Sequence, residues 1–122
     1  GCKVSDGKSE QTEYLKTDRT DISYDGTVRC RLTSGHECDG EVCTKIEPKI
    51  TIAWNKKEQT YQRCDKSGCT KVAVQASSSG AFTNVHSQNG MMAKFSSKGT
   101  MLEVATLLDY VLVYRGLCEP GG

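Results

Sequence analysis

The stretch TVRCRLT, residues 27–33, decides the fold class. Within it Val28, Cys30 and Leu32 alternate with polar residues, which is the pattern of a β-strand with one buried and one wetted face. No segment after Gly26 requires a long helix. Similar short runs recur downstream, and together they predict about eight strands: 27–33, 50–54, 60–64, 72–76, 82–85, 91–95, 102–104 and 110–114.

Polar turns separate these runs. Asn89-Gly90 predicts a type I′ hairpin turn, and the serine-rich run 77–80 predicts a break between strands. Short strands joined by short turns predict an antiparallel meander, which closes or nearly closes into a small barrel. We therefore predict an all-β, disulfide-linked, barrel-like domain, with a two-sheet β-sandwich as the alternative.

The chain divides by composition into three parts. Residues 1–25 are polar and charged and follow neither the helical nor the strand period, so we expect a flexible N-terminal tail. Residues 26–119 form a single β-domain, and residues 120–122 form a C-terminal tail. Because only 36% of the 122 residues are hydrophobic, the core is thin and cross-links are needed to support it.

Charge and hydropathy exclude two classes of partner. There are 16 Lys and Arg residues against 15 Asp and Glu residues, and no basic stripe that would bind nucleic acid. No apolar run approaches the roughly 20 residues of a membrane helix. No Asn-x-Ser/Thr sequence occurs, which favours a bacterial envelope over a eukaryotic secretory route.

Two cysteine pairs share one spacing, Cys38-x4-Cys43 and Cys64-x4-Cys69. Each encloses a turn sequence, Asp-Gly in the first and Asp-Lys-Ser-Gly in the second, so each pair is predicted to close on itself across a hairpin. The alternative is a zinc site made by these four thiolates, although a spacing of four is at the edge of the range that such sites use.

Three cysteines lie outside these pairs. Cys30 in the first strand and Cys118 after the last would join the two ends of the meander, although six cysteines allow fifteen pairings. Cys2 then remains. The sequence Gly1-Cys2 before a hydrophilic segment resembles the mature N-terminus of a bacterial lipoprotein, and the alternative is a free or intermolecular cysteine.

Few residues suggest catalysis. His36 and His86 are expected to be solvated, and the serines at 77–79 lack the Gly-x-Ser-x-Gly setting of a nucleophile. Strand alternation places Leu102 and Val104 on the apolar face and turns Glu103 away from it, which argues against a buried general acid. We therefore predict that the protein is not an enzyme and uses no cofactor.

The second half of the chain carries four short motifs: YxRCDxxGC at 61–69, SGxF at 79–82, EVAT at 103–106 and GxC at 116–118. In these motifs the chain resembles a set of small uncharacterised exported proteins of proteobacteria. The resemblance implies a bacterial, exported origin and a pairing role for Cys64, Cys69 and Cys118. It implies no activity.

The function expected from these features is that of a non-enzymatic envelope or surface domain that binds a protein or a small ligand. The compartment would be the bacterial periplasm, the outer membrane or the cell surface, with membrane attachment only through a lipid on Cys2. Two alternatives stay open. One is a structural subunit, a homo-oligomer that assembles through strand edges or the N-terminal tail. The other is a zinc-binding or thiol-dependent enzyme.

Overall fold

The computed structural model describes residues 26–121, and this part of the chain is entirely β-structure and turns. No helix long enough to cross a membrane occurs in it. The strand count exceeds the predicted one by two. The strands are β1 Thr27–Asp39, β2 Val42–Ile46, β3 Thr51–Asn55, β4 Thr60–Asp65, β5 Gly68–Ala73, β6 Gln75–Ser79, β7 Phe82–His86, β8 Met91–Ser96, β9 Thr100–Thr106 and β10 Tyr110–Gly121.

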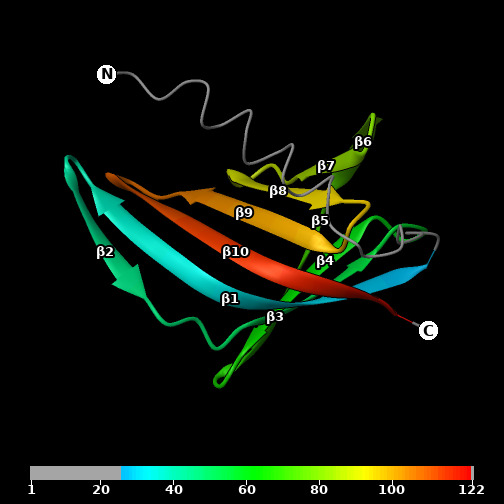
Figure 1. Cartoon of the computed structure of the whole chain (residues 1–122), viewed down its shortest axis with the longest axis horizontal. Helices are drawn as coiled ribbons and strands as arrows, with labels where there is room; N and C mark the ends of the chain where they lie inside the picture. The colour runs from blue at the N-terminus through cyan, green and yellow to red at the C-terminus, as the bar shows by residue number, and fades with distance from the viewer. Residues whose placement is uncertain (1–25, 122) are drawn as a thin grey trace.

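The strands form one curved antiparallel sheet with the order β5-β4-β3-β1-β10-β9-β8-β7-β6 (Figure 1). The short strand β2 pairs with the second half of β1, on the edge of β1 whose first half pairs with β3. The two edge strands, β5 and β6, are consecutive in the chain, and Val74 between them donates its N–H to the carbonyl of Gln59. The sheet is therefore a nearly closed barrel, which confirms the all-β, barrel-like prediction.

The first and last strands lie side by side at the centre of the sheet. Their register places Cys30 opposite Cys118 and shifts by one residue between Leu32 and Ser34. This bulge reverses the phase of β1, so that Leu32 and Gly35 both face the interior. Gly35 is required there, because a Cβ atom on it would lie 2.4 Å from Cδ1 of Tyr114.

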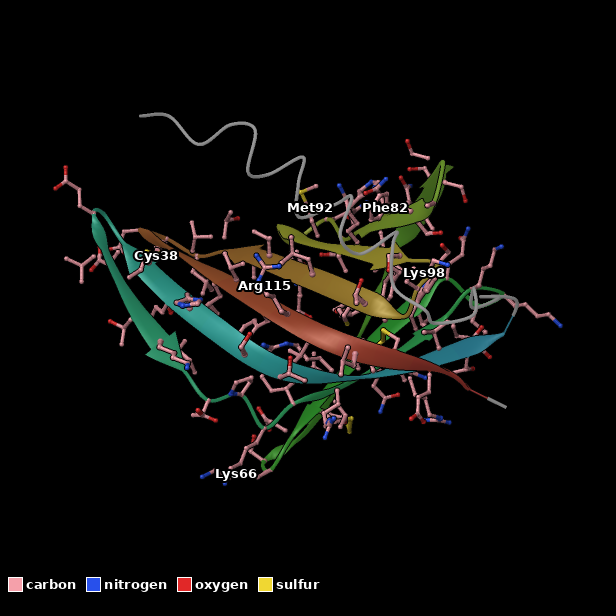
Figure 2. The ribbon with its side chains drawn as sticks, viewed as in Figure 1. Cys38, Lys66, Phe82, Met92, Lys98 and Arg115 are labelled. Carbon is pink, nitrogen blue, oxygen red and sulfur yellow. A yellow bond between two sulfur atoms is a disulfide. The ribbon has the colours of Figure 1, made fainter. Side chains whose placement is uncertain are left out.

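The core lies inside the barrel. Trp54 and Phe95 stack with their ring centroids 4.9 Å apart, and Tyr61 and Tyr114 are also buried, so these four strand aromatics belong to the interior. Side chains between the inward ones project outward from the sheet (Figure 2). The remaining buried apolar residues are Val28, Cys30, Leu32, Ile52, Val74, Val85, Met91, Ala93, Met101 and Cys118.

All three predicted disulfides are present: Cys30–Cys118, Cys38–Cys43 and Cys64–Cys69. The first joins β1 to β10, and the other two each close a hairpin, with Cα atoms 4.0 Å apart. The zinc alternative is therefore wrong, because the four sulfurs that it needs are bonded in pairs. The predicted N-terminal tail, with Cys2, lies outside the described residues.

Several local predictions are wrong. The run at 72–76 is divided into β5 and β6, and the serines at 77–79 continue β6 rather than break it. In the β7–β8 loop φ is positive at Gly90 but not at Asn89, so the turn is not type I′. β10 continues to Gly121, and residues 120 and 121, assigned above to a C-terminal tail, pair with the start of β1.

Candidate functional site

A cavity of about 390 Å³ opens at one end of the barrel. The β4–β5 turn, the β7–β8 loop and the β9–β10 loop surround its mouth, through Ser67, Asn89 and Leu107 respectively. Apolar atoms make up more of the wall than polar atoms do, and titratable side chains lie among the apolar ones. The apolar residues are Val72, Met91, Ala105, Leu107 and Leu112, and the titratable ones are Tyr61, Arg63, Asp65 and Glu103.

Glu103 is at the floor of this cavity and is only 1% exposed. The prediction that it points away from the apolar face is wrong. The sequence Met-Leu-Glu-Val-Ala, residues 101–105, is apolar on both faces of the strand, so it permits either phase. Pairing with the neighbouring strands decides the phase, because it places Glu103 opposite Ala93 and Tyr114, which both face inward.

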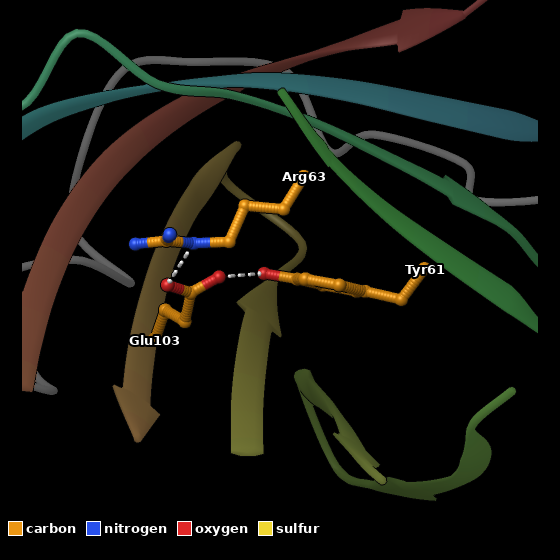
Figure 3. A network of polar contacts seen from close by, with 3 residues as sticks. All are labelled: Tyr61, Arg63 and Glu103. Atoms are coloured by element: carbon orange, nitrogen blue, oxygen red, sulfur yellow. Dashed lines mark hydrogen bonds and ion pairs between the residues drawn. The ribbon is translucent and has the colours of Figure 1, made fainter. Parts of the chain in front are cut away.

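Both oxygens of the Glu103 carboxylate accept hydrogen bonds (Figure 3). The Tyr61 hydroxyl donates to Oε2 at 2.5 Å, and Nε of Arg63 donates to Oε1 at 3.0 Å. Since β4 and β9 are not neighbours in the sheet, these bonds cross the interior of the barrel. The network therefore ties opposite walls together beneath the cavity.

The surroundings fix the protonation of the two donors. Burial raises the pKa of Tyr61, and the charge and hydrogen bond of Glu103 raise it further, so the phenol keeps its proton. Burial lowers the pKa of Arg63, but Glu103 and a hydrogen bond with Tyr114 outweigh that effect and the pKa is raised overall. The Arg63 guanidinium, 5.1 Å above the Tyr114 ring, is therefore permanently cationic.

The floor is polar and still has hydrogen-bonding capacity. Each carboxylate oxygen of Glu103 has a second lone pair, and Arg63 has four N–H groups besides the one at Nε. The Arg63 side chain is 32% exposed, so part of it is accessible from the cavity that it lines. The site therefore combines apolar walls with an ion pair that is neutral overall and whose arginine is partly accessible from the cavity.

Asp65 marks the rim. Its carboxylate accepts hydrogen bonds at Oδ1 from the hydroxyl of Ser67 at 2.6 Å and from the Ser67 backbone N–H at 2.8 Å. These two bonds lower the pKa of Asp65, the hydroxyl contributing most. The rim therefore carries a fixed negative charge in a turn that the adjoining Cys64–Cys69 disulfide closes.

The histidines and serines considered from sequence lie elsewhere. His36 on β1 and His86 at the end of β7 are exposed, as are the serines at 77–79 on β6. None of them lines the cavity. Between residues 26 and 121, no three His, Cys, Asp or Glu side chains gather in a way that would hold a metal ion.

Sequence reasoning missed the ion pair. The usable signal was a single acidic residue, Glu103, flanked on each side by apolar residues in a predicted strand, together with Tyr61 and Arg63 two residues apart on another. A charge in such a setting is expected to have a buried partner. The sequence does not say which strand supplies that partner.

Comparison with known proteins gives no match to any family model, curated protein or solved structure. The class that the fold and site define is a disulfide-linked, barrel-like β-domain with an amphipathic cavity at one end. Cavities in the mouths of β-barrels are frequent ligand sites, with mostly apolar walls and a few polar groups that orient the ligand.

Proposed function

We propose that this chain is a non-enzymatic binding domain that holds a small amphipathic ligand in the mouth of its barrel. The apolar part of the ligand would lie against Val72, Met91 and Leu112, and its polar end would reach Arg63 and Glu103 at the floor. The observation that carries the proposal is the buried, cross-barrel ion pair beneath an open cavity of about 390 Å³, which is within the usual range for ligand sites.

The chemistry of the lining supports binding rather than catalysis. The Tyr61 hydroxyl and Glu103 are held to each other, and the raised pKa of Tyr61 keeps it from acting as a base. At the rim the Ser67 hydroxyl donates to Asp65, and the described residues that line the cavity include no histidine to activate that hydroxyl. Ligand binding requires no change in these hydrogen bonds, whereas acid–base or nucleophilic chemistry would require them to break.

The disulfides favour an exported location, which is compatible with the same proposal. Three disulfides in a chain of 122 residues are typical of oxidising compartments. We place the domain in the bacterial periplasm, at the outer membrane or on the cell surface, where small binding domains scavenge, carry or sense amphipathic compounds. Fractionation of the native cells, followed by detection of the chain in the cytosolic fraction, would contradict this location.

The binding proposal is tested with octanol, octanoate and octylamine by isothermal titration calorimetry. These probes share one apolar chain and differ in their polar group, so that together they cover the hydrogen-bonding capacity of the floor. For the probe that binds best, shortening the chain from octyl to hexyl and butyl should weaken binding about fourfold per CH₂ removed. Failure of all three probes to bind would refute the proposal.

A matched pair of variants assigns any binding to the cavity. Ala105→Phe fills the cavity from β9, and we expect it to abolish binding. Val104→Phe adds the same ring at the next residue, which faces outward, and should leave the affinity unchanged. Equal affinities in the two variants would place the probe elsewhere. Circular dichroism of both variants verifies that the fold is intact.

A second candidate function is that of a structural subunit. One edge each of β5 and β6 is unpaired within the described part of the sheet, and an extended segment of another copy could pair there. Both strands are short and polar, which is how proteins usually prevent such pairing. Sedimentation equilibrium of the full chain tests the candidate, and a monomer at high concentration would rule it out.

A further inference from the structure

Two rows of side chains cross the outer face of the sheet, and the strand register fixes their members. The first, the apolar row, contains Val113, Val104 and Met92, which lie side by side on β10, β9 and β8. The second, the basic row, contains Arg115, Leu102 and Lys94 on the same three strands. The two rows are adjacent, because their members are two residues apart along each strand.

The side chains of both rows point outward, because the residues that alternate with them along the strands are buried. Met91, Ala93 and Glu103 are buried inside the barrel, so Met92, Lys94 and Leu102 project from the other face. Met92 is 59% exposed, and Val104, Val113 and Leu102 are half-buried. The exposed face of an antiparallel sheet is usually polar. An apolar row in this position therefore needs an explanation.

Further apolar residues lie next to the rows. Phe82 on β7 lies beside Lys94, whose Nζ is 5.3 Å from the Phe82 ring centroid. Leu117 follows Arg115 on β10 and is 44% exposed. Figure 2 shows Met92, Phe82 and Arg115 on the outer side of the sheet, with Lys98 at the β8–β9 turn. The apolar surface therefore extends over four strands.

The charged side chains of the two rows are both basic, whereas Glu119, exposed on the same face of β10 two residues beyond Leu117, lies outside the rows. The basic row has Arg115 and Lys94, and the apolar row is flanked by the polar side chains of His36 on β1 and His86 on β7. Every position of the two rows, from β1 to β7, is described, and none is acidic. Glu103, the acidic residue of β9, points into the barrel.

From this pattern we propose that the outer face of β8, β9 and β10 rests on the surface of an anionic lipid bilayer. Aliphatic side chains next to basic ones bind at such interfaces, because the apolar groups enter the headgroup boundary while the cations pair with lipid phosphates. Charge complementarity selects an anionic surface. The proposal is independent of the ligand cavity, which opens at the end of the barrel.

The test measures cosedimentation of the full chain with two kinds of vesicle, phosphatidylcholine alone and phosphatidylcholine mixed with phosphatidylglycerol. We expect binding to the mixed vesicles only, and release by salt. The double substitution Lys94→Gln with Arg115→Gln should weaken binding about 25-fold, because each basic residue near an anionic surface contributes about a fivefold change in affinity. Met92→Ser should weaken binding as well.

The matched control removes the same charge from another part of the surface. Lys66, at the tip of the β4–β5 hairpin (Figure 2), and Lys71 on β5 are replaced by Gln, and this variant should bind as the wild type does. An equal loss in the control would show that only net charge matters and would overturn the proposal. So would equal binding to phosphatidylcholine alone.

Other occupants of the face would give different results. Binding to polyglutamate without binding to the mixed vesicles would identify an acidic protein as the partner and overturn the proposal. A dimer in sedimentation velocity that Met92→Ser dissociates would identify a second copy of this chain, and would overturn it too.

Discussion

Removing the cation of the buried ion pair is the perturbation whose effect the structure determines best. Arg63→Met keeps the length and apolar stem of the side chain but removes the guanidinium. Glu103, 1% exposed, would keep its hydrogen bond from Tyr61 and lose its only charged partner among the described residues. A carboxylate held away from water without a compensating charge is strongly destabilising.

The magnitude follows from the exposure of the two partners. Removing one member of a fully buried pair costs about 3–5 kcal/mol. Since the Arg63 side chain is 32% exposed, water from the cavity would reach part of the vacated space. We therefore expect Arg63→Met to lower the free energy of unfolding by about 2–3 kcal/mol, below that range.

A second substitution makes the prediction specific to the charge. Glu103→Gln keeps an acceptor for the Tyr61 hydroxyl and leaves a guanidinium that solvent can reach, so it should cost about 1 kcal/mol. Adding Glu103→Gln to Arg63→Met removes the stranded charge and should restore roughly 1–2 kcal/mol relative to Arg63→Met. We therefore expect Glu103→Gln, which is destabilising by itself, to stabilise the Arg63→Met variant.

The assay is urea unfolding at pH 7, followed by far-UV circular dichroism, for the wild type, the two single variants and the double variant. Arg29→Met serves as the control, because Arg29 is an exposed arginine on β1, and it should cost less than about 0.5 kcal/mol. The reasoning is refuted if the double variant is less stable than Arg63→Met, or if Arg63→Met matches the control.

Three further predictions concern stability. Gly35→Ala should cost about 1–3 kcal/mol in urea unfolding, because the new Cβ would lie 2.4 Å from a buried ring carbon; a neutral result would show that the ring moves easily. Replacing Cys30 and Cys118 by alanine should cost about 4–5 kcal/mol in the chain-entropy model, against about 2 for either hairpin disulfide, because its loop spans 88 residues instead of 5; equal losses would contradict the model. The pKa of Asp65 is lowered in the folded protein by the hydrogen bonds from Ser67, so the stability that it contributes is present at neutral pH and is lost as the pH falls below about 3.9. Unfolding curves of the wild type and Asp65→Asn should therefore differ at pH 7 and converge in acid, and a constant difference would be evidence against this assignment.

The parts of the fold that the sequence predicts are those where one face of a strand is buried. Val28, Cys30 and Leu32 are inward as expected, because polar residues separate them and leave only one possible phase. The two Cys-x4-Cys hairpins are also predictable, since each contains a turn sequence between the cysteines. Both β2 and β6 were missed because their side chains are mostly exposed, so no alternation marks them.

The site was less predictable than the fold. Residues 101–105 fit either phase, and in a strand a one-residue change of phase exchanges its two faces. Pairing of β9 with β8 and β10 determines which face of β9 is buried, and that pairing cannot be predicted from residues 101–105 alone. The partner of Glu103 comes from β4, 40 residues away, by closure of the barrel. The phase change at the bulge after Leu32 is equally invisible, because no single residue type specifies it.

The central claim is that the cavity at the barrel mouth binds the ligand, and the three methionines of the chain allow a direct test. Met91 lines the cavity, Met92 lies on the outer face, and Met101 is buried in the core. In ¹³C-methyl methionine NMR spectra, titration with the best-binding octyl probe should shift the Met91 signal and leave the Met92 signal in place. A shift confined to Met92, or no shift at saturating probe, would contradict the account.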